Sequence, residues 1–284
     1  MHFYLNWSGG LENRMTKANK QLCLATYNIW NSDEGMPFRC ECILHEIQKI
    51  HPDIVCLQEV QNKEMAQMLA VKLDMSCFFA SYENDEEGIC VLSKYPITVK
   101  EDWMYINAQY MTFQYESKIV GIVNVHLPWD SVIMREKYIT NIVSKLDDKK
   151  CDYIFVLGDF NSGDNSDVVR MIMGDCSLNG TEANPCFYDL ALASAQMRGV
   201  PANNTLDFSN NPRFCENTIE INQRFDRIFL RNTYPLKFPK LITCDVFGTK
   251  VYSEINLSAS DHYGVYAVIE SEWECGKRYM GNNV

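Results

Sequence analysis

The sequence predicts an α/β fold in which helices bury a core of β-sheet. The apolar-rich run 54–60 and the continuous apolar run 153–157 are typical of strands that are buried on both faces. Amphipathic stretches such as 131–146, whose apolar residues recur every three or four positions, are typical of helices that cover a sheet. No repeat with a period of about 20–50 residues is present, which argues against a solenoid.

The predicted elements alternate between strand and helix along the chain. Strands are predicted at 22–30, 54–60, 89–93, 104–115, 119–127, 153–157, 224–230 and 263–269. Helices are predicted from Pro37 to 50, at 62–73 and at 131–146. Asp130 or Ser131 is available as the N-cap of the third helix.

The composition is that of an ordinary soluble globular protein. Of the 284 residues, 46% are hydrophobic, enough to bury a sizeable core in one domain at 21–270. We expect a loosely ordered lead-in at 1–20 and a peripheral tail at 271–284. The net charge of -11 argues against tight, sequence-independent binding of long duplex DNA. It is compatible with a small phosphodiester or a nucleic-acid end as substrate, and with carboxylates that collect Mg²⁺.

The 12 cysteines are scattered, and no CxxC pair is present. This pattern favours reduced thiols in a reducing compartment, so a cytoplasmic location is expected, with the nucleus as an alternative. The first 20 residues lack the apolar run of a signal peptide, and no stretch is apolar enough for a membrane-spanning helix. The spacing of Cys and His also does not suit a structural zinc site.

Polar residues stand at the ends of the apolar strands, where burial is costly unless a side chain is paired or bound to a metal. A single residue of this kind is most often a turn former. Here six such places together supply oxygen ligands for Mg²⁺ and two imidazoles for phosphate chemistry. The residues are Asn28, Glu59, Asn124 with His126, Asp159 with Asn161, Asp226, and Asp261 with His262.

These residues lie in six blocks that resemble the motifs of the endonuclease/exonuclease/phosphatase (DNase I-like) superfamily, in the order of that family and across 22–269. The blocks are Thr26-Tyr27-Asn28, Leu57-Gln58-Glu59-Val60, Asn124-Val125-His126-Leu127, Gly158-Asp159-Phe160-Asn161, Phe225-Asp226-Arg227-Ile228 and Ser260-Asp261-His262. The resemblance implies a two-sheet β-sandwich flanked by helices, a four-layer α/β/β/α fold, with the motifs at one end of both sheets.

Within the superfamily the chain is most similar to the type two tyrosyl-DNA phosphodiesterases. The segment 223–231 and the preceding Thr205-x-Asp207 carry this likeness. Two segments depart from it. Ser162-Gly163-Asp164 lacks an Arg of that group, and Leu127-Pro128-Trp129-Asp130 replaces its Glu-Ser. Both departures fall near the expected substrate groove, so they concern the substrate more than the phosphodiester chemistry.

The residue types suggest a metal site and a role for each ligand. Glu59 is expected to bind Mg²⁺ directly, with Mn²⁺ as a substitute, because a full carboxylate stands at a strand end. Asn28 and Asp261 are expected to complete or orient the metal shell. The metal would offset negative charge on the phosphate in the transition state.

The remaining residues suggest how water and phosphate are handled. Asp159 is expected to orient or deprotonate the attacking water, and Asn161 to hold that water or a phosphate oxygen. His262 is expected to contact the phosphate as a cation, with Asp226 fixing its tautomer and raising its pKa. His126 is a second phosphate contact or a proton donor to the leaving group.

Several residues and one segment have two readings. Asn124 is expected to support His126 or to have a structural role, and Trp129 and Tyr263 to stack on substrate or to pack. Arg227 could reach a phosphate, but it is expected to face outward from its strand. The polar stretch 194–223 is either a substrate-facing loop or a surface insertion.

The predicted function is Mg²⁺-dependent hydrolysis of a phosphodiester in a nucleic acid or nucleotide-like substrate, with a 5′-tyrosyl DNA end, and hence DNA repair, as one form. The alternative within the superfamily is a lipid or sugar-phosphate phosphodiesterase or phosphatase of the sphingomyelinase or inositol-phosphatase kind. A binding module without activity is disfavoured because Glu59, Asp159 and His262 are all present.

Overall fold

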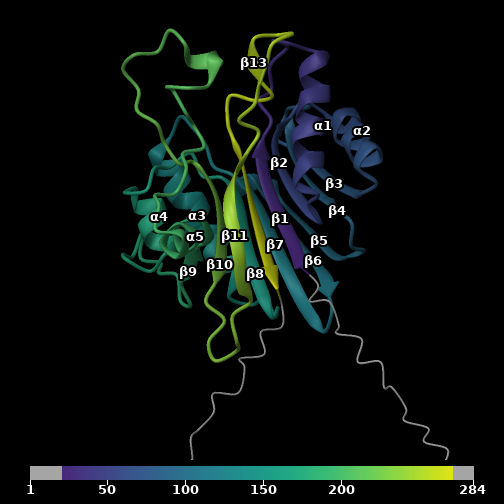
Figure 1. Ribbon diagram of the computed structural model, residues 1–284. Coiled ribbons are helices and arrows are strands. Elements are labelled where there is room, and N and C mark those ends of the chain that lie inside the picture. The colour runs from purple at the N-terminus through teal and green to yellow at the C-terminus, as the bar shows by residue number, and fades with distance from the viewer. Residues whose placement is uncertain (1–20, 271–284) are drawn as a thin grey trace, which may run out of the picture.

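Two six-stranded sheets pack face to face, with helices on their outer faces (Figure 1). The structure, a computed structural model, describes residues 21–270, so the expected lead-in and tail lie outside the described residues. The four layers are those implied by the resemblance. The predicted α/β fold class is therefore confirmed.

The first sheet has the order β11-β14-β1-β2-β4-β3. Its strands are β1 (Gln21–Asn28), β2 (Ile54–Val60), β3 (Ser76–Ser81), β4 (Gly88–Ser93), β11 (Lys240–Phe247) and β14 (Gly264–Glu270). β1 and β2 run parallel, and β14 runs antiparallel to β1. The last residues of β1 and β2 therefore lie at the same end of the sheet as the first residues of β14.

The second sheet has the order β5-β6-β7-β8-β10-β9. Its strands are β5 (Ile97–Trp103), β6 (Ala108–Tyr115), β7 (Lys118–His126), β8 (Tyr153–Asp159), β9 (Phe187–Asp189) and β10 (Asp226–Arg231). β7 and β8 run parallel with His126 opposite Asp159, and β10 runs antiparallel with Asp226 opposite Asp159. The register alone thus places three predicted site residues side by side.

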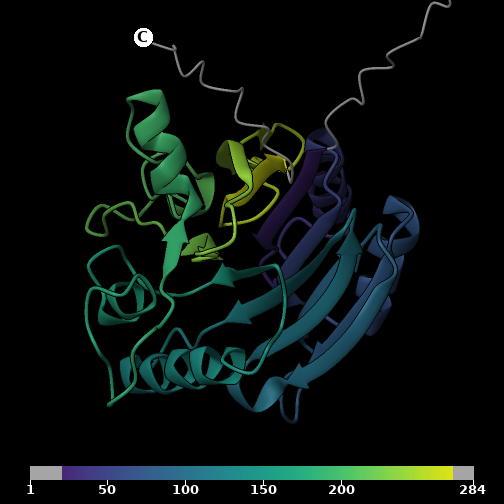
Figure 2. The same ribbon diagram turned by 90° about the horizontal axis from the view of Figure 1, so that it is seen from below.

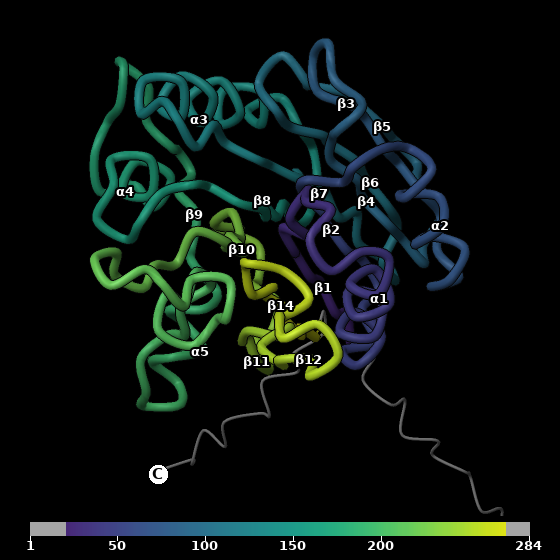
Figure 3. The backbone as a smooth tube through the Cα atoms, turned by 90° about the horizontal axis from the view of Figure 1, so that it is seen from above, coloured from purple at the N-terminus to yellow at the C-terminus, as the bar shows by residue number. Residues whose placement is uncertain are grey.

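Helices cover the two outer faces of the sandwich, which is clearest in the view along the strands in Figure 3. The helices are α1 (Phe38–Ile50), α2 (Lys63–Leu73), α3 (Val132–Leu146), α4 (Asp167–Ile172) and α5 (Leu190–Arg198). The buried apolar side chains of α1 and α2 pack against the first sheet, and those of α3 and α4 pack against the second. Figure 2 shows α3 along the outside of the second sheet. A third core fills the space between the sheets, with Leu24, Phe113 and Phe155 fully buried.

The predicted helix 131–146 begins one residue later, at Val132. Of the two predicted candidates, Ser131 is the N-cap and Asp130 is not: the Ser131 hydroxyl accepts a hydrogen bond from the Met134 N–H at 3.2 Å. Capping of this kind satisfies an amide that has no partner inside the helix.

Some elements differ from the prediction. β3, β5 and β11 were not predicted, because their side chains are only partly buried and do not alternate cleanly. The strand predicted at 104–115 begins only at Ala108, after the 3₁₀ turn Met104–Ile106. α4 and α5 are further additions, and α5 extends into the stretch predicted as aperiodic. Short elements complete the list: η2 (Pro212–Phe214), β12 (Val251–Tyr252) and β13 (Leu257–Ser258).

The eleven cysteines within residues 21–270 are all free thiols. None of the helices in this part of the chain combines the length and the hydropathy needed to cross a lipid bilayer.

Candidate active site

All the predicted metal and catalytic residues lie at one end of the sandwich, the upper end of the strands in Figure 1. They come from the ends of β1, β2, β7 and β8, the start of β10 and the turn before β14. They are Asn28, Glu59, His126, Asp159, Asn161, Asp226, Asp261 and His262. The parallel pairs bring strand ends from each sheet together, so residues far apart in sequence become neighbours.

Asp159 is at the centre of this group and is 1% exposed. Its Oδ2 accepts a hydrogen bond from the Asn28 amide at 3.0 Å, and its Oδ1 accepts one from the Asn161 backbone N–H at 2.8 Å. The Nε2 atoms of His126 and His262 lie 3.7 and 3.9 Å from Oδ2. The carboxylate is therefore held by two amide donors and lies between two imidazoles.

The backbone around Asp159 has a shape that only certain residues allow. Gly158 has φ +148°, and a Cβ there would lie 1.9 Å from the Val125 carbonyl oxygen. Glycine is therefore required where β8 passes the end of β7. Asn161 has φ +46°, and its side-chain amide donates to the Leu127 carbonyl at 2.9 Å. The turn after β8 is thus tied to the residue that follows His126.

Glu59 stands at a β-bulge near the end of β2, where the register with β4 shifts between Leu57 and Val60. Its φ is +55°, an uncommon conformation for a glutamate. Its Oε1 accepts from the Asn28 amide at 2.8 Å, and its Oε2 from the Asn31 N–H at 2.9 Å. The bulge directs the carboxylate away from the strand ladder and toward the site.

Glu59 and Asp261 are the two carboxylates predicted from the sequence to lie at the divalent cation, and the charge of Glu59 acts on Asp261. Burial raises the pKa of Asp261 to about 6; the charge of His262 lowers it, and that of Glu59 raises it. The charge of Arg213 also lowers the pKa of Asp261. Glu59 Oε1 lies 3.9 Å from His126 Nε2. Carboxylate oxygens are among the ligands that Mg²⁺ prefers. The side-chain oxygen of Asn28 (Oδ1) already accepts from the Trp30 N–H at 3.0 Å, and its amide donates to Glu59, so Asn28 as placed orients Glu59.

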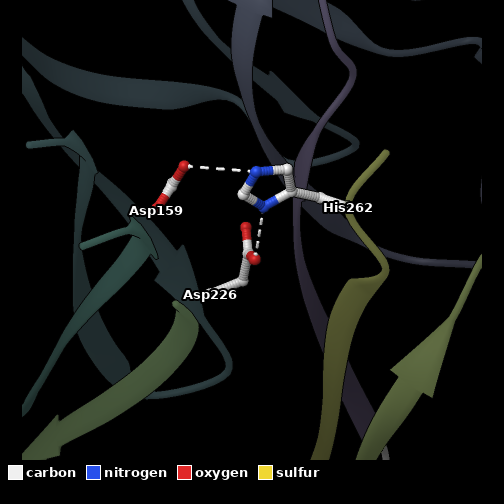
Figure 4. A group of neighbouring side chains, drawn as sticks. All are labelled: Asp159, Asp226 and His262. Atoms are coloured by element: carbon white, nitrogen blue, oxygen red, sulfur yellow. Dashed lines mark hydrogen bonds and ion pairs between the residues drawn. The ribbon is translucent and has the colours of Figure 1, made fainter. Parts of the chain in front are cut away.

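A second acidic group consists of Asp159, Asp226 and His262, whose possible ligand atoms lie within 4.8 Å of one another (Figure 4). The Nδ1 of His262 is 2.8 Å from Asp226 Oδ2. Burial alone would lower the pKa of His262, but the charges of Asp226 and Asp159 raise it well above its ordinary value. The imidazole of His262 thus lies between these two carboxylates, with its Nδ1 next to Asp226 and its Nε2 3.9 Å from Asp159 Oδ2.

Replacing Asp226 by Asn is expected to lower the pKa of His262, because the amide keeps the shape and loses the charge. In the wild type, stabilisation by this pair is fully present below the unfolded-state pKa of about 6.5 and is lost as pH rises through the raised folded-state value. In Asp226→Asn the folded-state pKa of His262 is lower, so the stabilisation is lost at a lower pH than in the wild type. Urea unfolding at several pH values tests this. Asp245→Asn, which loses a pairing with Arg198, is the control, and identical stability profiles for Asp226→Asn and wild type would contradict the expectation.

Residues that were not predicted hold the Asp261–His262 turn in place. Asn211 is buried, and its amide donates to the carbonyl oxygens of Ser260 and Asp261 at 3.0 and 3.1 Å. The Ser260 hydroxyl donates to the Asn28 carbonyl at 2.7 Å, which links this turn to the end of β1. The Asn-rich run near Thr205 is the sequence signal for this contact, which we call the Asn211 clamp. The sequence does not show the clamp itself, because Ser260, whose carbonyl accepts from Asn211, lies 49 residues further along the chain.

The variant Asn211→Ala is expected to lower the free energy of unfolding by about 1–3 kcal/mol, because two buried carbonyl groups lose their donor. Asn210, whose amide bonds only an exposed carboxylate, provides the matched control Asn210→Ala. Urea unfolding of both variants measures the difference. Equal stability of the two variants would show that the Asn211 clamp contributes nothing.

Arg227 does not face outward, so that expectation is wrong. Its side chain is fully buried, with Nη1 3.0 Å from Asp189 Oδ2 and Nη2 2.7 Å from Asp164 Oδ1. Its Nη2 also donates to the Ser162 carbonyl at 3.2 Å. Phe229, two residues on and on the same face of β10, packs with buried residues of α3 and α4, so this face is covered, and the buried charge is paired with carboxylates.

The structure also shows where the other residues lie for which two roles were predicted. Asn124 is fully buried and donates to the carbonyl oxygens of Leu57 and Cys90, which favours its structural reading. Trp129 is 79% exposed, and Tyr263 is buried. Tyr82, which lies in no motif, places its hydroxyl 2.5 Å from His126 Nδ1.

A cavity of about 790 Å³ adjoins the site: Asn161 belongs to both, and Phe225, which precedes Asp226, also lines the cavity. It lies between the first residues of α3 and α4 and the later part of the stretch 194–223. Leu206, Phe208 and Ile221 form its apolar side. Its lining includes Asn161, Ser162 and Gly163, which belong to the turn that follows Asp159.

The sequence matches the endonuclease/exonuclease/phosphatase family over residues 25–262. Among solved structures, truncated TDP2 of Caenorhabditis elegans is similar with a TM-score of 0.67 and 18% identity, over 88% of this chain and 98% of that one. TDP2 of D. rerio complexed with single strand DNA product has a TM-score of 0.67 and 16% identity, over 88% and 99%. ANGEL2, a 2′,3′-cyclic phosphatase, has a TM-score of 0.66 and 15% identity, over 89% and 96%. A search of curated proteins found no match.

Proposed function

Because the chain belongs to the endonuclease/exonuclease/phosphatase family, a family of phosphoric ester hydrolases, we propose that it hydrolyses phosphodiesters with the help of a divalent cation. One observation carries the proposal: the buried carboxylate of Asp159 lies within 4 Å of the imidazole Nε2 atoms of His126 and His262. A base beside two phosphate-binding imidazoles is the arrangement that attack by water on a phosphodiester requires.

Glu59 and Asp261 would hold the cation, with Asn28 orienting Glu59. We propose Mg²⁺, with Mn²⁺ as a substitute, because the donors are carboxylate oxygens. When bound, the cation would offset negative charge on a phosphate oxygen.

The roles of the other residues follow from their contacts. Asp159 accepts a proton from the attacking water, and Asn161, held by its bond to the Leu127 carbonyl, positions that water or a phosphate oxygen. His262 binds a phosphate oxygen through Nε2 as a cation, while Asp226 fixes Nδ1. His126 makes a second contact, to the phosphate or to the leaving group.

We propose a nucleic-acid end or a nucleotide-like molecule as substrate, with a 5′-tyrosyl DNA end as its most specific form. The cavity beside Asn161 supports this proposal, because its apolar side suits bases or an aromatic leaving group. The net charge of -11 disfavours long duplexes, which bind through basic surfaces. The similarity to a structure that contains a single strand DNA product also supports a strand end.

A substrate panel tests the leaving group. The purified protein with Mg²⁺ is offered a 5′-tyrosyl oligonucleotide, single-stranded DNA and RNA, an abasic duplex, a 2′,3′-cyclic nucleotide and sphingomyelin. Fastest turnover of the tyrosyl end is expected. Faster turnover of the cyclic nucleotide or the lipid would overturn the proposed substrate, and the proposed hydrolytic chemistry would still stand.

We further propose that residues 21–270 act as one catalytic domain in a reducing compartment, the cytoplasm or the nucleus. The free thiols of the eleven described cysteines support this location, because an oxidising compartment favours disulfides.

A further inference from the structure

The two imidazoles at the site have different partners at Nδ1. His262 bonds the carboxylate of Asp226, whereas His126 bonds the phenol of Tyr82 at 2.5 Å. Tyr82 precedes the turn into β4, and its backbone N–H bonds the Glu87 carbonyl at 2.8 Å. The ring planes of Tyr82 and His126 are tilted by 56°, with centroids 5.8 Å apart, so the contact is made by the polar atoms and not by stacking.

The hydroxyl of Tyr82 has two partners: His126 Nδ1 at 2.5 Å and a backbone hydrogen bond from Glu59. A backbone amide can only donate, so of these two partners only His126 Nδ1 can accept the phenol hydrogen.

The other side of the His126 ring agrees with this direction. Its Nε2 lies 3.9 Å from Glu59 Oε1 and 3.7 Å from Asp159 Oδ2. Both neighbours are acceptors, so a hydrogen on Nε2 is favoured and a lone pair there is not. Contacts on both sides of the ring thus select the same tautomer.

We propose that Tyr82 is a positioning residue that holds His126 in the tautomer with its hydrogen on Nε2, directed at the reacting phosphate. The role rests on the proposed function, since His126 acts there as the second phosphate contact. A phenol brings no charge, in contrast to Asp226. His262 is therefore held by a charged partner, whereas His126 is held by an uncharged one and presents its Nε2 hydrogen in a fixed orientation.

The variant Tyr82→Phe removes the hydroxyl and keeps the ring. We expect kcat on bis-p-nitrophenyl phosphate to fall by about 10–100-fold, with KM changed much less, since outer partners of a functional imidazole have effects of this size. The control is Tyr110→Phe, which removes another buried hydroxyl, bonded to Cys151 Sγ at 3.3 Å, and is expected to retain wild-type kcat. Thermal unfolding of both variants checks that the fold is retained.

Nitrogen-15 NMR of the histidine rings in the full chain at about pH 8.5 reads the tautomer without any substrate. His126→Ala identifies the signals of His126. The Nε2–H form is expected in the wild type, and a mixture with the Nδ1–H form in Tyr82→Phe. Wild-type protein in the Nδ1–H form, or a spectrum of His126 that Tyr82→Phe leaves unchanged, would overturn the proposal.

The double variant shows whether Tyr82 acts through His126. In the His126→Ala background, Tyr82→Phe is expected to have no further effect on kcat. An equal loss with and without His126 would contradict the positioning role. If NMR shows the expected tautomer in a protein without phosphodiesterase activity, the proposed function fails and the hydrogen-bond assignment stands. If the enzyme is active and His126 has the other tautomer, the proposed function stands and the role of Tyr82 fails.

Discussion

Replacing Asp159 by Asn is expected to lower kcat for phosphodiester hydrolysis by about 10³-fold, because an amide cannot accept the proton of the attacking water. The side chain keeps its size, and at 1% exposure it stays enclosed by the same neighbours. Substrate binding depends mainly on the imidazoles and the adjoining cavity, so KM should change little. Steady-state kinetics on bis-p-nitrophenyl phosphate measure both constants.

The same strand provides a control for this variant. Asp152 lies just before β8, at the opposite end from Asp159, and pairs with Lys118 at 3.2 Å. Asp152→Asn is expected to retain wild-type kcat. If Asp159→Asn also retained it, the assignment of Asp159 as the base would be wrong.

Replacing Glu59 by Gln is expected to raise the concentration of Mg²⁺ or Mn²⁺ needed for half-maximal activity by about 100-fold or more, because the cation loses a charged ligand. The bonds from Asn28 and the Asn31 N–H to the carboxylate at 2.8 and 2.9 Å show that the side chain is already fixed in position. Calorimetric titration with Mn²⁺ measures the affinity independently of turnover.

Glu64→Gln, in the exposed first turn of α2, is the matched control and should bind Mn²⁺ as the wild type does. Unchanged Mn²⁺ affinity in Glu59→Gln would show that Glu59 does not bind the cation and that other residues do. The group of Asp159, Asp226 and His262 would then be the next candidate.

The elements that the sequence predicts well are those with both a strong period and a buried face. β2 matches its predicted bounds, and α3 differs by one residue. β3 and β5 lie at the edges of their sheets, where partial exposure weakens the alternation on which prediction depends. The aperiodic stretch after α5 is held by distant partners, which a local pattern does not contain.

The residues of the candidate site also fall into those that the sequence predicts and those that it does not. Its main residues stand at strand ends within apolar runs, so they were visible in the sequence, and the structure brings them together. Arg227 was misread because Asp189 lies 38 residues away. Tyr82 was missed because it lies 44 residues from His126 and in no motif. Side chains whose role depends on one long-range partner leave no local signal.

The central claim is that this end of the sandwich hydrolyses phosphodiesters with a divalent cation. Its most direct test is the turnover of bis-p-nitrophenyl phosphate by chelator-treated protein as Mg²⁺ is added back. The account predicts no turnover in the chelator, saturable recovery with Mg²⁺ or Mn²⁺, and weakened recovery in Glu59→Gln. Turnover that persists in the chelator, or recovery that is identical in Glu59→Gln, would contradict it.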